Sequence, residues 1–358
     1  GEIIGENDYS VAYGENTNVG SGSVRVTGKA NYKGSVEKTF DINPFEFTAD
    51  NITVDPVDDV IYNGSAQKQQ TTVRADLDGD GVFETKLTEN VDCTLTYSGD
   101  LVNVTDVGVQ ISVTGINNYS GALEKAVSYF IKERSLQSEG ITAVVNPDKL
   151  VYTGKEQYPA VEVYDNDVRL VNGRDYTLEY KNNIQSGTAT VKISGIGNYK
   201  DERNLEFVII ANTDKLNVAV SPSDKVVYNG RNQRPDLIVK SGDKDVSYEA
   251  VYSYNGGTPQ SFNLLSEFVD AGVYTITVQG TGNYEGAAGS VNFVILPAEF
   301  TVEDISAQDF TGNAIEPKPA VKADGKTLKE GVDYVLSYSD NVAVGENTAS
   351  VKVTGIGN

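Results

Sequence analysis

The chain has 358 residues, of which 51 are acidic and 29 are basic, so its net charge is −22. A surface this acidic repels phosphate backbones and anionic lipids, so we expect no nucleic-acid partner and no binding to anionic membranes. The chain has no histidine and one cysteine, which excludes Ser-His-Asp and Cys-His catalysis, His-ligated metals and an internal disulfide. No apolar run approaches the roughly 18 residues of a membrane helix, so we expect no membrane insertion.

A short segment with a leading glycine and an Asn-Tyr pair recurs along the chain. Its copies are 28–32, 115–119, 195–199, 280–284 and, without the tyrosine, 355–358. The copies are 75 to 87 residues apart, which is too long for a solenoid repeat but suits a small domain with its own core. We therefore predict a partial repeat at 1–46, complete repeats at 47–133, 134–212 and 213–297, and a partial repeat at 298–358.

The third copy has the clearest strand pattern. Apolar and polar residues alternate over 141–145, 160–164, 175–180, 188–194 and 205–209. Ala189, Val191 and Ile193 share one face, as in an antiparallel strand with one buried side. About seven short strands in roughly 80 residues predict an all-β fold of tandem immunoglobulin-like β-sandwich modules. The joints are short and have no Gly/Ser tract, which predicts a semi-rigid chain arranged as an extended rod.

The repeated segment suits a tight turn. In the third copy we assign Gly195, Gly197 and Asn198 to a structural turn in which two nearby positions with positive φ reverse the chain. The following Tyr199 is expected to pack its ring under this turn. A phosphate-binding loop is excluded because no helix follows the glycines.

The second copy carries an acidic insertion between two predicted strands. Asp76, Asp78 and Asp80 occupy positions 1, 3 and 5 of a calcium-loop pattern, and a glycine follows at position 6. Glu84 at position 9 could replace the ligand that Leu87 cannot supply at position 12. The alternative is a longer acidic hairpin turn, which the same Asp and Gly residues favour.

The fourth copy carries a longer insertion at about 253–269. Its side chains Tyr254, Phe262, Leu265 and Phe268 are candidates for contact with a protein or glycan ligand, because loops rich in apolar residues often form contact surfaces. The alternative is a flap that folds over the edge of the sandwich or over a neighbouring module.

The single cysteine, Cys93, begins the middle strand of the second copy. Tyrosines stand at the same place in other copies, for example Tyr176 and Tyr334. We therefore expect Cys93 to be a buried structural residue and not a reactive thiol.

Both ends of the chain fall inside a repeat, which predicts a fragment of a longer array. The alternative is strand exchange between chains, in which residues 32–42 of one chain complete the last repeat of another. The carboxylates scatter along turns and exposed strand faces without a repeated pair in an apolar setting. We therefore assign no catalytic residue and expect no enzyme activity.

Several motifs of the third copy occur together. They are Tyr-x-Gly (152–154), Pro-x-Val-x-Val (159–163), Leu-x-x-Gly-x-Asp-Tyr (170–176), Tyr-x-x-Asn (180–183), Ser-Gly-Ile-Gly-Asn-Tyr (194–199) and Phe-x-Ile (207–209). This set resembles the tandem bacterial immunoglobulin-like repeats of the MBG/YDG-like group, which occur in large secreted and wall-attached proteins of Gram-positive anaerobes. The resemblance covers essentially the whole chain. It implies an extracellular, cell-surface or cell-wall-associated stalk and offers no catalytic residues to transfer.

The function that follows is a non-catalytic stalk that presents another domain or an adhesive tip. Its neighbours would be flanking modules of the same parent chain, and we expect a monomer. The alternative is an adhesin that binds a host protein or glycan through the inserted loops of the second and fourth repeats. Calcium is the one cofactor that the sequence suggests.

Overall fold

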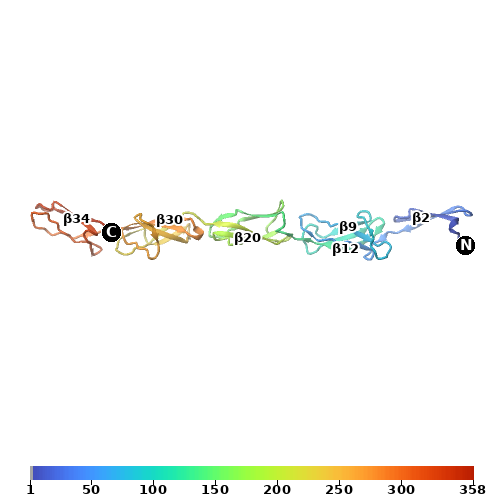
Figure 1. The fold of residues 1–358 in the computed structure, drawn as a ribbon, viewed down its shortest axis with the longest axis horizontal. Coiled ribbons are helices and arrows are strands. Elements are labelled where there is room, and N and C mark those ends of the chain that lie inside the picture. The colour runs from blue at the N-terminus through green and yellow to red at the C-terminus, as the bar shows by residue number, and fades with distance from the viewer. Residues whose placement is uncertain (1–2) are drawn as a thin grey trace. The chain divides into compact units, whose positions relative to one another are not determined.

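A computed structural model describes residues 3–358 of the chain (Figure 1). Strands and two short 3-10 turns make up its regular secondary structure, and no α-helix occurs among the described residues. By their internal contacts the residues form two compact units. One unit contains Gly1–Val144, Val161–Glu179 and Val191–Leu205, and the other contains Val145–Ala160, Tyr180–Thr190 and Glu206–Asn358. The division runs inside the predicted 134–212 repeat, so the predicted repeat boundaries stay predictions.

The first two repeats consist of short strands. The first has the turn η1 (Glu6–Asp8) and strands β1 (Tyr9–Gly14), β2 (Gly20–Gly28) and β3 (Ser35–Ile42). The second has β4 (Phe45–Glu46), β5 (Ile52–Val54), β6 (Val60–Ile61), β7 (Val73–Ala75), β8 (Thr85–Lys86), β9 (Cys93–Ser98), β10 (Val109–Gly115), β11 (Tyr119–Ser120), β12 (Ala122–Tyr129) and β13 (Ile131–Lys132).

The remaining repeats follow the same order of strands. The third has β14 (Arg134–Ser135), β15 (Ile141–Asn146), β16 (Lys149–Val151), β17 (Ala160–Asp165), β18 (Val168–Arg169), β19 (Tyr176–Lys181), β20 (Gly187–Gly195), β21 (Tyr199–Lys200) and β22 (Glu202–Ile210). The fourth has β23 (Asn217–Ser221), β24 (Lys225–Val227), β25 (Asp236–Ser241), β26 (Lys244–Asp245), β27 (Tyr248–Tyr254), β28 (Gln260–Ser261), β29 (Gly272–Gly280), the turn η2 (Gly282–Tyr284) and β30 (Ala288–Leu296). The fifth has β31 (Thr301–Val302), β32 (Val321–Ala323), β33 (Lys326–Thr327), β34 (Tyr334–Ser339) and β35 (Ser350–Gly355).

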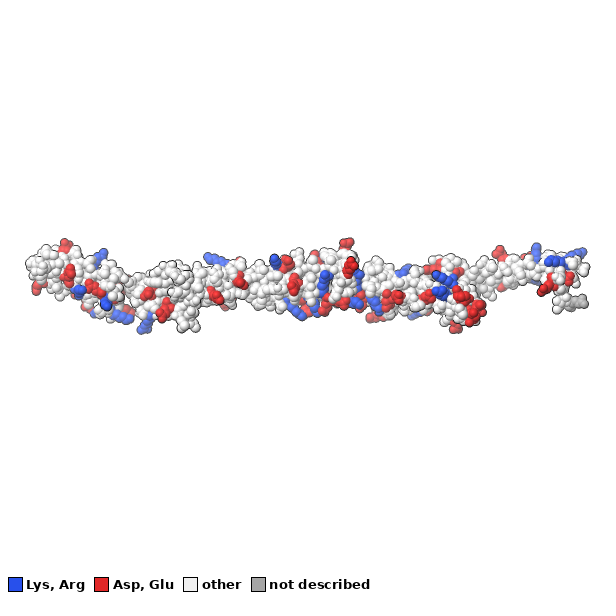
Figure 2. Space-filling view, viewed as in Figure 1, with Lys and Arg blue, Asp and Glu red and all other residues white. Residues whose placement is uncertain are grey.

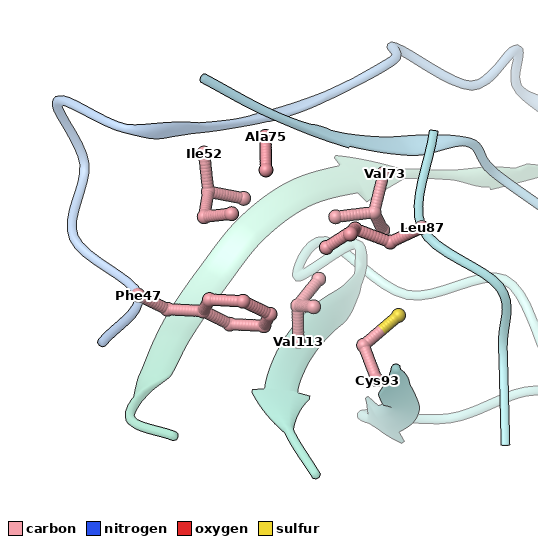
Figure 3. Packing of buried hydrophobic residues seen from close by; sticks show 7 residues of the cluster. All are labelled: Phe47, Ile52, Val73, Ala75, Leu87, Cys93 and Val113. Carbon is pink, nitrogen blue, oxygen red and sulfur yellow. The ribbon is translucent and has the colours of Figure 1, made fainter. Parts of the chain in front are cut away.

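The second repeat is a β-sandwich. Its sheets β5-β7-β8 and β12-β10-β9 contribute side chains to one buried cluster. Figure 3 shows Val73 and Leu87 above Val113, with the sulfur of Cys93 turned into the same cluster. Cys93 is 1% exposed, so the expectation of a buried structural cysteine is confirmed.

The fourth repeat has the same construction, and its first strand is divided between two sheets. β23 belongs to the sheet β23-β25-β26, whereas β24 joins the sheet β24-β30-β29-β27-β28. Val239 of the first sheet and Val278 of the second lie in one core cluster with Leu216 and Tyr284. The predicted all-β fold of immunoglobulin-like β-sandwich repeats is therefore confirmed, while the extended arrangement of the repeats stays a prediction.

The strand pattern of the third repeat is confirmed within a few residues. The five predicted segments correspond to β15, β17, β19, β20 and β22. Ala189, Val191 and Ile193 are fully buried on one face of β20, and the residues between them are half-buried. The period of two in the sequence therefore located both the strand and its buried face.

The sheet of the first repeat presents apolar side chains to solvent. β1, β2 and β3 form one antiparallel sheet, in which Val11, Val26 and Val36 lie opposite one another in a row across the strands. All three side chains are exposed. In the complete repeats the corresponding face is covered by a second sheet.

The charged side chains of both signs are spread along the face shown in Figure 2. On the face shown in Figure 2, acidic and basic residues are interspersed over the surface. Among residues 3–358, no helix is long and apolar enough to cross a membrane.

Candidate functional site: the joints between repeats

The asparagine of each repeated Gly-Asn segment binds the preceding repeat. In the described chain this arrangement occurs at four joints. The pairs are Asn118 with Asn18 and Val19, Asn198 with Asn103 and Val104, Asn283 with Gln185 and Ser186, and Asn358 with Asp270 and Ala271. The partner loop lies directly before β2, β20 or β29 at three joints, and at the joint of the second and third repeats Val104 lies in the loop that leads to β10.

The side-chain amide of the asparagine makes at least two bonds at each of these joints, one as acceptor and one as donor. At the joint of the second and third repeats, Asn198 Oδ1 accepts from the Val104 N–H at 2.8 Å, and Asn198 Nδ2 donates to Asn103 Oδ1 at 2.9 Å. At the joint of the first and second repeats, Asn118 makes the equivalent bonds at 2.9 and 3.0 Å. An amide side chain is required here because only it offers a donor and an acceptor side by side.

The backbone of the same asparagine binds the linker. The Asn118 carbonyl accepts from the Phe45 N–H at 3.0 Å, and the Asn198 carbonyl accepts from the Arg134 N–H at 2.9 Å. The Asn283 carbonyl accepts from a linker N–H, also at 2.9 Å. The asparagine of a repeat is therefore hydrogen-bonded both to the linker and to the loop of the preceding repeat.

The tyrosine after the asparagine packs against the preceding repeat. Tyr199 meets Tyr62 with ring centroids 5.5 Å apart and ring planes at 75°. Tyr284 meets Tyr152 in the same edge-to-face geometry, at 5.5 Å and 83°. Edge-to-face pairs of this kind add stability beyond the area that they bury. Both Tyr62 and Tyr152 come from the Tyr-x-Gly segments, so two repeated motifs meet at the joint.

The joint of the second and third repeats also holds an ion pair. Arg134, in the linker, lies 3.0 Å from Asp165, and both side chains are largely shielded from solvent. The Tyr199 hydroxyl donates to the same carboxylate oxygen that Arg134 contacts, Asp165 Oδ2, at 3.2 Å. Burial, and next the charge of Asp165, raise the pKa of Tyr199 well above its ordinary value. The hydroxyl therefore stays protonated and remains a donor.

The turn itself differs from the prediction. Gly197 has φ of +66°, but Gly195 and Asn198 are not among the positive-φ positions of the described chain. A Cβ on Gly195 would lie 2.6 Å from the Lys200 backbone nitrogen, so this glycine is required for a close approach of two chain segments. The prediction of two positive-φ positions is therefore wrong. Asn198 is explained by its bonds across the joint.

A hollow of about 410 Å³ lies at the joint of the fourth and fifth repeats. Its lining includes Tyr228, Lys326 and Asn358. Tyr228 belongs to the third Tyr-x-Gly segment. The tyrosines at the same place in the first two segments, Tyr62 and Tyr152, contact Tyr199 and Tyr284. The hollow is therefore part of the joint and not a separate site.

The acidic insertion of the second repeat folds as a tight loop around Asp76. The two oxygens of this buried carboxylate accept from the N–H groups of Gly79 at 2.7 Å and Gly81 at 2.8 Å. The hydrogen bond from Gly81 is the main reason that the pKa of Asp76 is lowered. Ligand atoms of Asp76, Asp78 and Asp80 lie within 4.8 Å of one another, and among the described residues Glu84 is not part of this group. The calcium site stays a prediction.

The insertion of the fourth repeat divides into a buried and an exposed part. Phe268 is 0% exposed and stacks on Tyr274 with ring centroids 4.3 Å apart. Its ring is therefore inaccessible to a ligand. For this residue the alternative applies, in which the insertion folds over the sandwich. Phe262 is half-buried beneath the guanidinium of Arg234, 4.8 Å away. Tyr254 lies at the rim and donates to the Ala271 carbonyl. The predicted contact surface is thus reduced to the tip of the loop.

The tip exposes two adjacent leucines, Leu264 at 87% and Leu265 at 90%. It is held by hydrogen bonds of Asn263, whose N–H donates to the Ser266 hydroxyl at 2.8 Å and whose side chain accepts from the Leu265 N–H at 2.8 Å. The Ser266 hydroxyl in turn donates to the Ser261 carbonyl at 3.0 Å. The leucines therefore project from an ordered turn.

No protein-family model matches the chain, and no curated protein sequence matches it. Similar solved structures include the N-terminal eight immunoglobulin domains of Down Syndrome Cell Adhesion Molecule, with 11% identity over 94% of this chain and 57% of that chain, at a TM-score of 0.25. Sidekick-1 immunoglobulin domains 1–5 match with 9% identity over 92% of this chain and 76% of that chain, at 0.25. The protocadherin gammaB4 extracellular domain matches with 9% identity over 99% and 76%, at 0.22. Scores this low carry no argument about function, so the fold class stands on the sheets described above.

Proposed function

We propose that the chain is a non-catalytic spacer of an extracellular bacterial cell-surface protein, in which it presents another domain or an adhesive tip. The observation that supports it is the repetition of one joint, with the same asparagine side chain bonded to the preceding repeat each time. A contact that recurs at each of these joints restrains the motion of a repeat against its neighbour. An array of such joints keeps its ends apart, as a spacer requires.

The resemblance to the MBG/YDG-like repeats supports the same proposal. It adds an extracellular location, in the cell wall or at the cell surface, and flanking modules of the same kind. The short linkers favour stiffness, since their backbone is bonded to the next repeat at Asn118, Asn198 and Asn283. The interspersed surface charges favour a monomer, because the net charge of −22 opposes self-association.

Small-angle X-ray scattering tests the spacer. Four module-equivalents, each about 30 Å long from strands of 8–10 residues, predict a maximum dimension of at least roughly 120 Å. Replacing Asn118, Asn198 and Asn283 together by alanine is expected to shorten and broaden the distance distribution while the β-sheet circular dichroism stays unchanged. Asn292→Ala is the control, because its side chain accepts from Thr275 within one repeat. A wild-type particle about half as long, or a triple variant indistinguishable from wild type, would refute the spacer.

A second candidate function rests on the tip of the fourth repeat. Two leucines exposed on an ordered turn support an adhesin that inserts them into an apolar pocket of a host protein or onto a glycan face. The double variant Leu264→Ser/Leu265→Ser is expected to abolish binding to host cells without changing the melting temperature. Equal binding by wild type and variant would exclude this surface.

A further inference from the structure

Four Asn-Gly pairs occur in the chain, and two of them lie in the Tyr-x-Gly segments at the joints. These are Asn63-Gly64 in the second repeat and Asn229-Gly230 in the fourth, which lines the hollow described above. The other two, Asn172-Gly173 and Asn255-Gly256, lie in turns of the third and fourth repeats. All four asparagines are exposed. Such pairs are prone to an internal reaction, because glycine has no Cβ to keep its backbone nitrogen away from the amide of the asparagine side chain.

In the two joint segments the asparagine side chain folds back over the peptide bond that follows it. Asn63 Oδ1 accepts from the Ser65 N–H at 2.9 Å, and Asn229 Oδ1 accepts from the Arg231 N–H, also at 2.9 Å. Each bond closes an Asx turn around the intervening glycine, so the glycine nitrogen and the amide carbon are held close together. The N–H that binds Oδ1 also draws electrons from the amide carbon, which favours attack on that carbon.

In the other two pairs one of the reacting groups is held by a different bond. The Gly173 N–H donates to the Tyr176 carbonyl at 2.7 Å, so this nitrogen is engaged. Asn255 Oδ1 accepts at 2.8 Å from the N–H of Val273 in β29, a residue 18 positions away. Ring closure in either pair must first break that bond. The structure therefore divides four chemically equal pairs into two that are arranged for reaction and two that are protected.

Threonine closes the same turn in other repeats. Thr153 Oγ1 accepts from the Lys155 N–H, and Thr311 Oγ1 accepts from the Asn313 N–H, each at 3.3 Å. The turn therefore needs a side-chain oxygen at this place, which either asparagine or threonine supplies. Threonine has no amide carbon and is inert in this reaction. Asparagine is thus not required for the turn itself, and the chain provides its own inert substitute.

We propose that Asn63 and Asn229 are sites of spontaneous deamidation. At Asn63 the Gly64 nitrogen gives its proton to solvent base and attacks the side-chain amide carbon. The new N–C bond closes a five-membered succinimide ring, the bond from this carbon to the amide nitrogen breaks, and ammonia leaves. Water then opens the ring at one of its two carbonyls. The product is either aspartate or isoaspartate, in which the main chain runs through the former side chain. Asn229 reacts in the same way with the Gly230 nitrogen.

The reaction at Asn63 alters a contact of the joint. A Cβ on Gly64 would lie 3.9 Å from the Tyr62 hydroxyl oxygen, so this glycine lies close to the end of the tyrosine side chain. The Tyr62 ring in turn contacts Tyr199 of the next repeat. Isoaspartate lengthens the main chain beside this contact and removes the side-chain acceptor of the Ser65 N–H, so we expect the joint to loosen. A spacer that softens with age rests on the proposed function, whereas the reaction depends on the turns alone.

Ageing of the full chain at mildly alkaline pH tests the proposal. Digestion and mass spectrometry report the mass gained when the amide NH2 becomes OH, and isoaspartyl methyltransferase identifies isoaspartate. We expect Asn63 and Asn229 to convert about 2- to 13-fold faster than Asn172 and Asn255, the factor that corresponds to one hydrogen bond that must first break. Ageing in urea is the reference, because all four pairs should convert at similar rates once the turns are lost. Rate ratios that are the same in native buffer and in urea would overturn the proposal.

The matched variant is Asn63→Thr, which keeps the turn acceptor seen at Thr153 and should not convert. Fresh wild type and variant should be cleaved by trypsin after Arg134 at the same rate, because the joint is intact in both. After equal ageing the wild type should be cleaved faster. Equal cleavage of the aged samples would refute the effect on the joint. A wild-type particle about half the length expected in scattering would refute the spacer, whereas the conversion rates of the four pairs would still stand.

Discussion

Asn198 Oδ1 accepts a hydrogen bond from the backbone N–H of Val104, a residue 94 positions earlier in the chain. The bond joins the turn at the entry of the third repeat to a loop of the second repeat. Asn198 Nδ2 donates to Asn103 Oδ1, which completes a two-bond contact with the same side chain. Since Asn118, Asn283 and Asn358 make the same contact at other joints, the asparagine of the repeated segment is a joint residue.

Asn198→Ala is expected to loosen the joint of the second and third repeats without unfolding either one. Two hydrogen bonds at about 0.5–1.5 kcal/mol each amount to roughly 1–3 kcal/mol, which is about a 5- to 150-fold change in the population of an open joint. Trypsin cleavage after Arg134 reports this opening, because Arg134 lies in the linker and its backbone N–H donates to the Asn198 carbonyl. Asn292→Ala should be cleaved at the wild-type rate. An unchanged rate for Asn198→Ala would show that the two bonds do not hold the joint.

Phe293→Ala is expected to unfold the fourth repeat alone. Phe293 is almost fully buried among Tyr274, Phe268 and Tyr252, and removing such a ring costs about 3–5 kcal/mol. A repeat of about 80 residues has only roughly 4–12 kcal/mol of stability. Calorimetry should therefore show one new transition at lower temperature.

Cys93 provides a local control for that experiment. Burial raises the pKa of its thiol, so the thiol should not react with Ellman's reagent while the second repeat is folded. In Phe293→Ala the thiol should stay protected through the new, lower transition. Reaction of Cys93 at that transition would mean that the repeats do not unfold independently.

The second repeat should lose stability in acid through Asp76. Backbone hydrogen bonds, first from Gly81, hold the pKa of this carboxyl below its ordinary value. A carboxyl with a lowered folded-state pKa contributes stability above its unfolded-state pKa of about 3.9, and this contribution is lost as pH falls through the folded-state pKa. Thermal melts from neutral pH to below pH 4 should show a smaller acid loss for Asp76→Asn than for wild type. An acid loss as large in Asp76→Asn as in wild type would contradict this role of Asp76.

Calcium is expected to bind the loop that brings Asp76, Asp78 and Asp80 together. Binding to the folded state alone raises the melting temperature of the second repeat, and chelator should reverse the rise. The double variant Asp78→Asn/Asp80→Asn keeps the Asp76 bonds that close the turn and should lose the calcium response. A wild-type melting temperature that is equal in calcium and in chelator would favour the plain acidic turn.

Local patterns in the sequence were sufficient for the fold. The period of two over β20 predicted its buried face, because alternate side chains of a strand point to opposite sides. The spacing of the repeated segments predicted several small cores in place of one large core. Cys93 was placed correctly because its position in the strand matches buried tyrosines such as Tyr176.

The same reasoning was less successful for the insertions and the turn. Phe268 was named as a candidate for ligand contact because loops rich in apolar residues often form contact surfaces, with a packed flap as the alternative, but it fills the core beside Tyr274. Two positive-φ positions were expected in the turn of Gly195, Gly197 and Asn198, but of these only Gly197 has a positive φ, and Gly195 is required by a close approach to the Lys200 backbone. In both cases the deciding neighbour belongs to another segment, and its distance is not encoded in the local pattern.

The sequence by itself determined the all-β class, the repeating cores and the exclusion of histidine-based chemistry, because these depend on composition and on the period of neighbouring residues. Only the tertiary structure decided what the asparagines do. The Asn198 side chain and the Val104 N–H are far apart in the chain, and a turn asparagine and a joint asparagine have the same local sequence. Their bond exists because two folded repeats bring a loop and a turn within hydrogen-bond distance, which is a property of packed surfaces and not of any one segment.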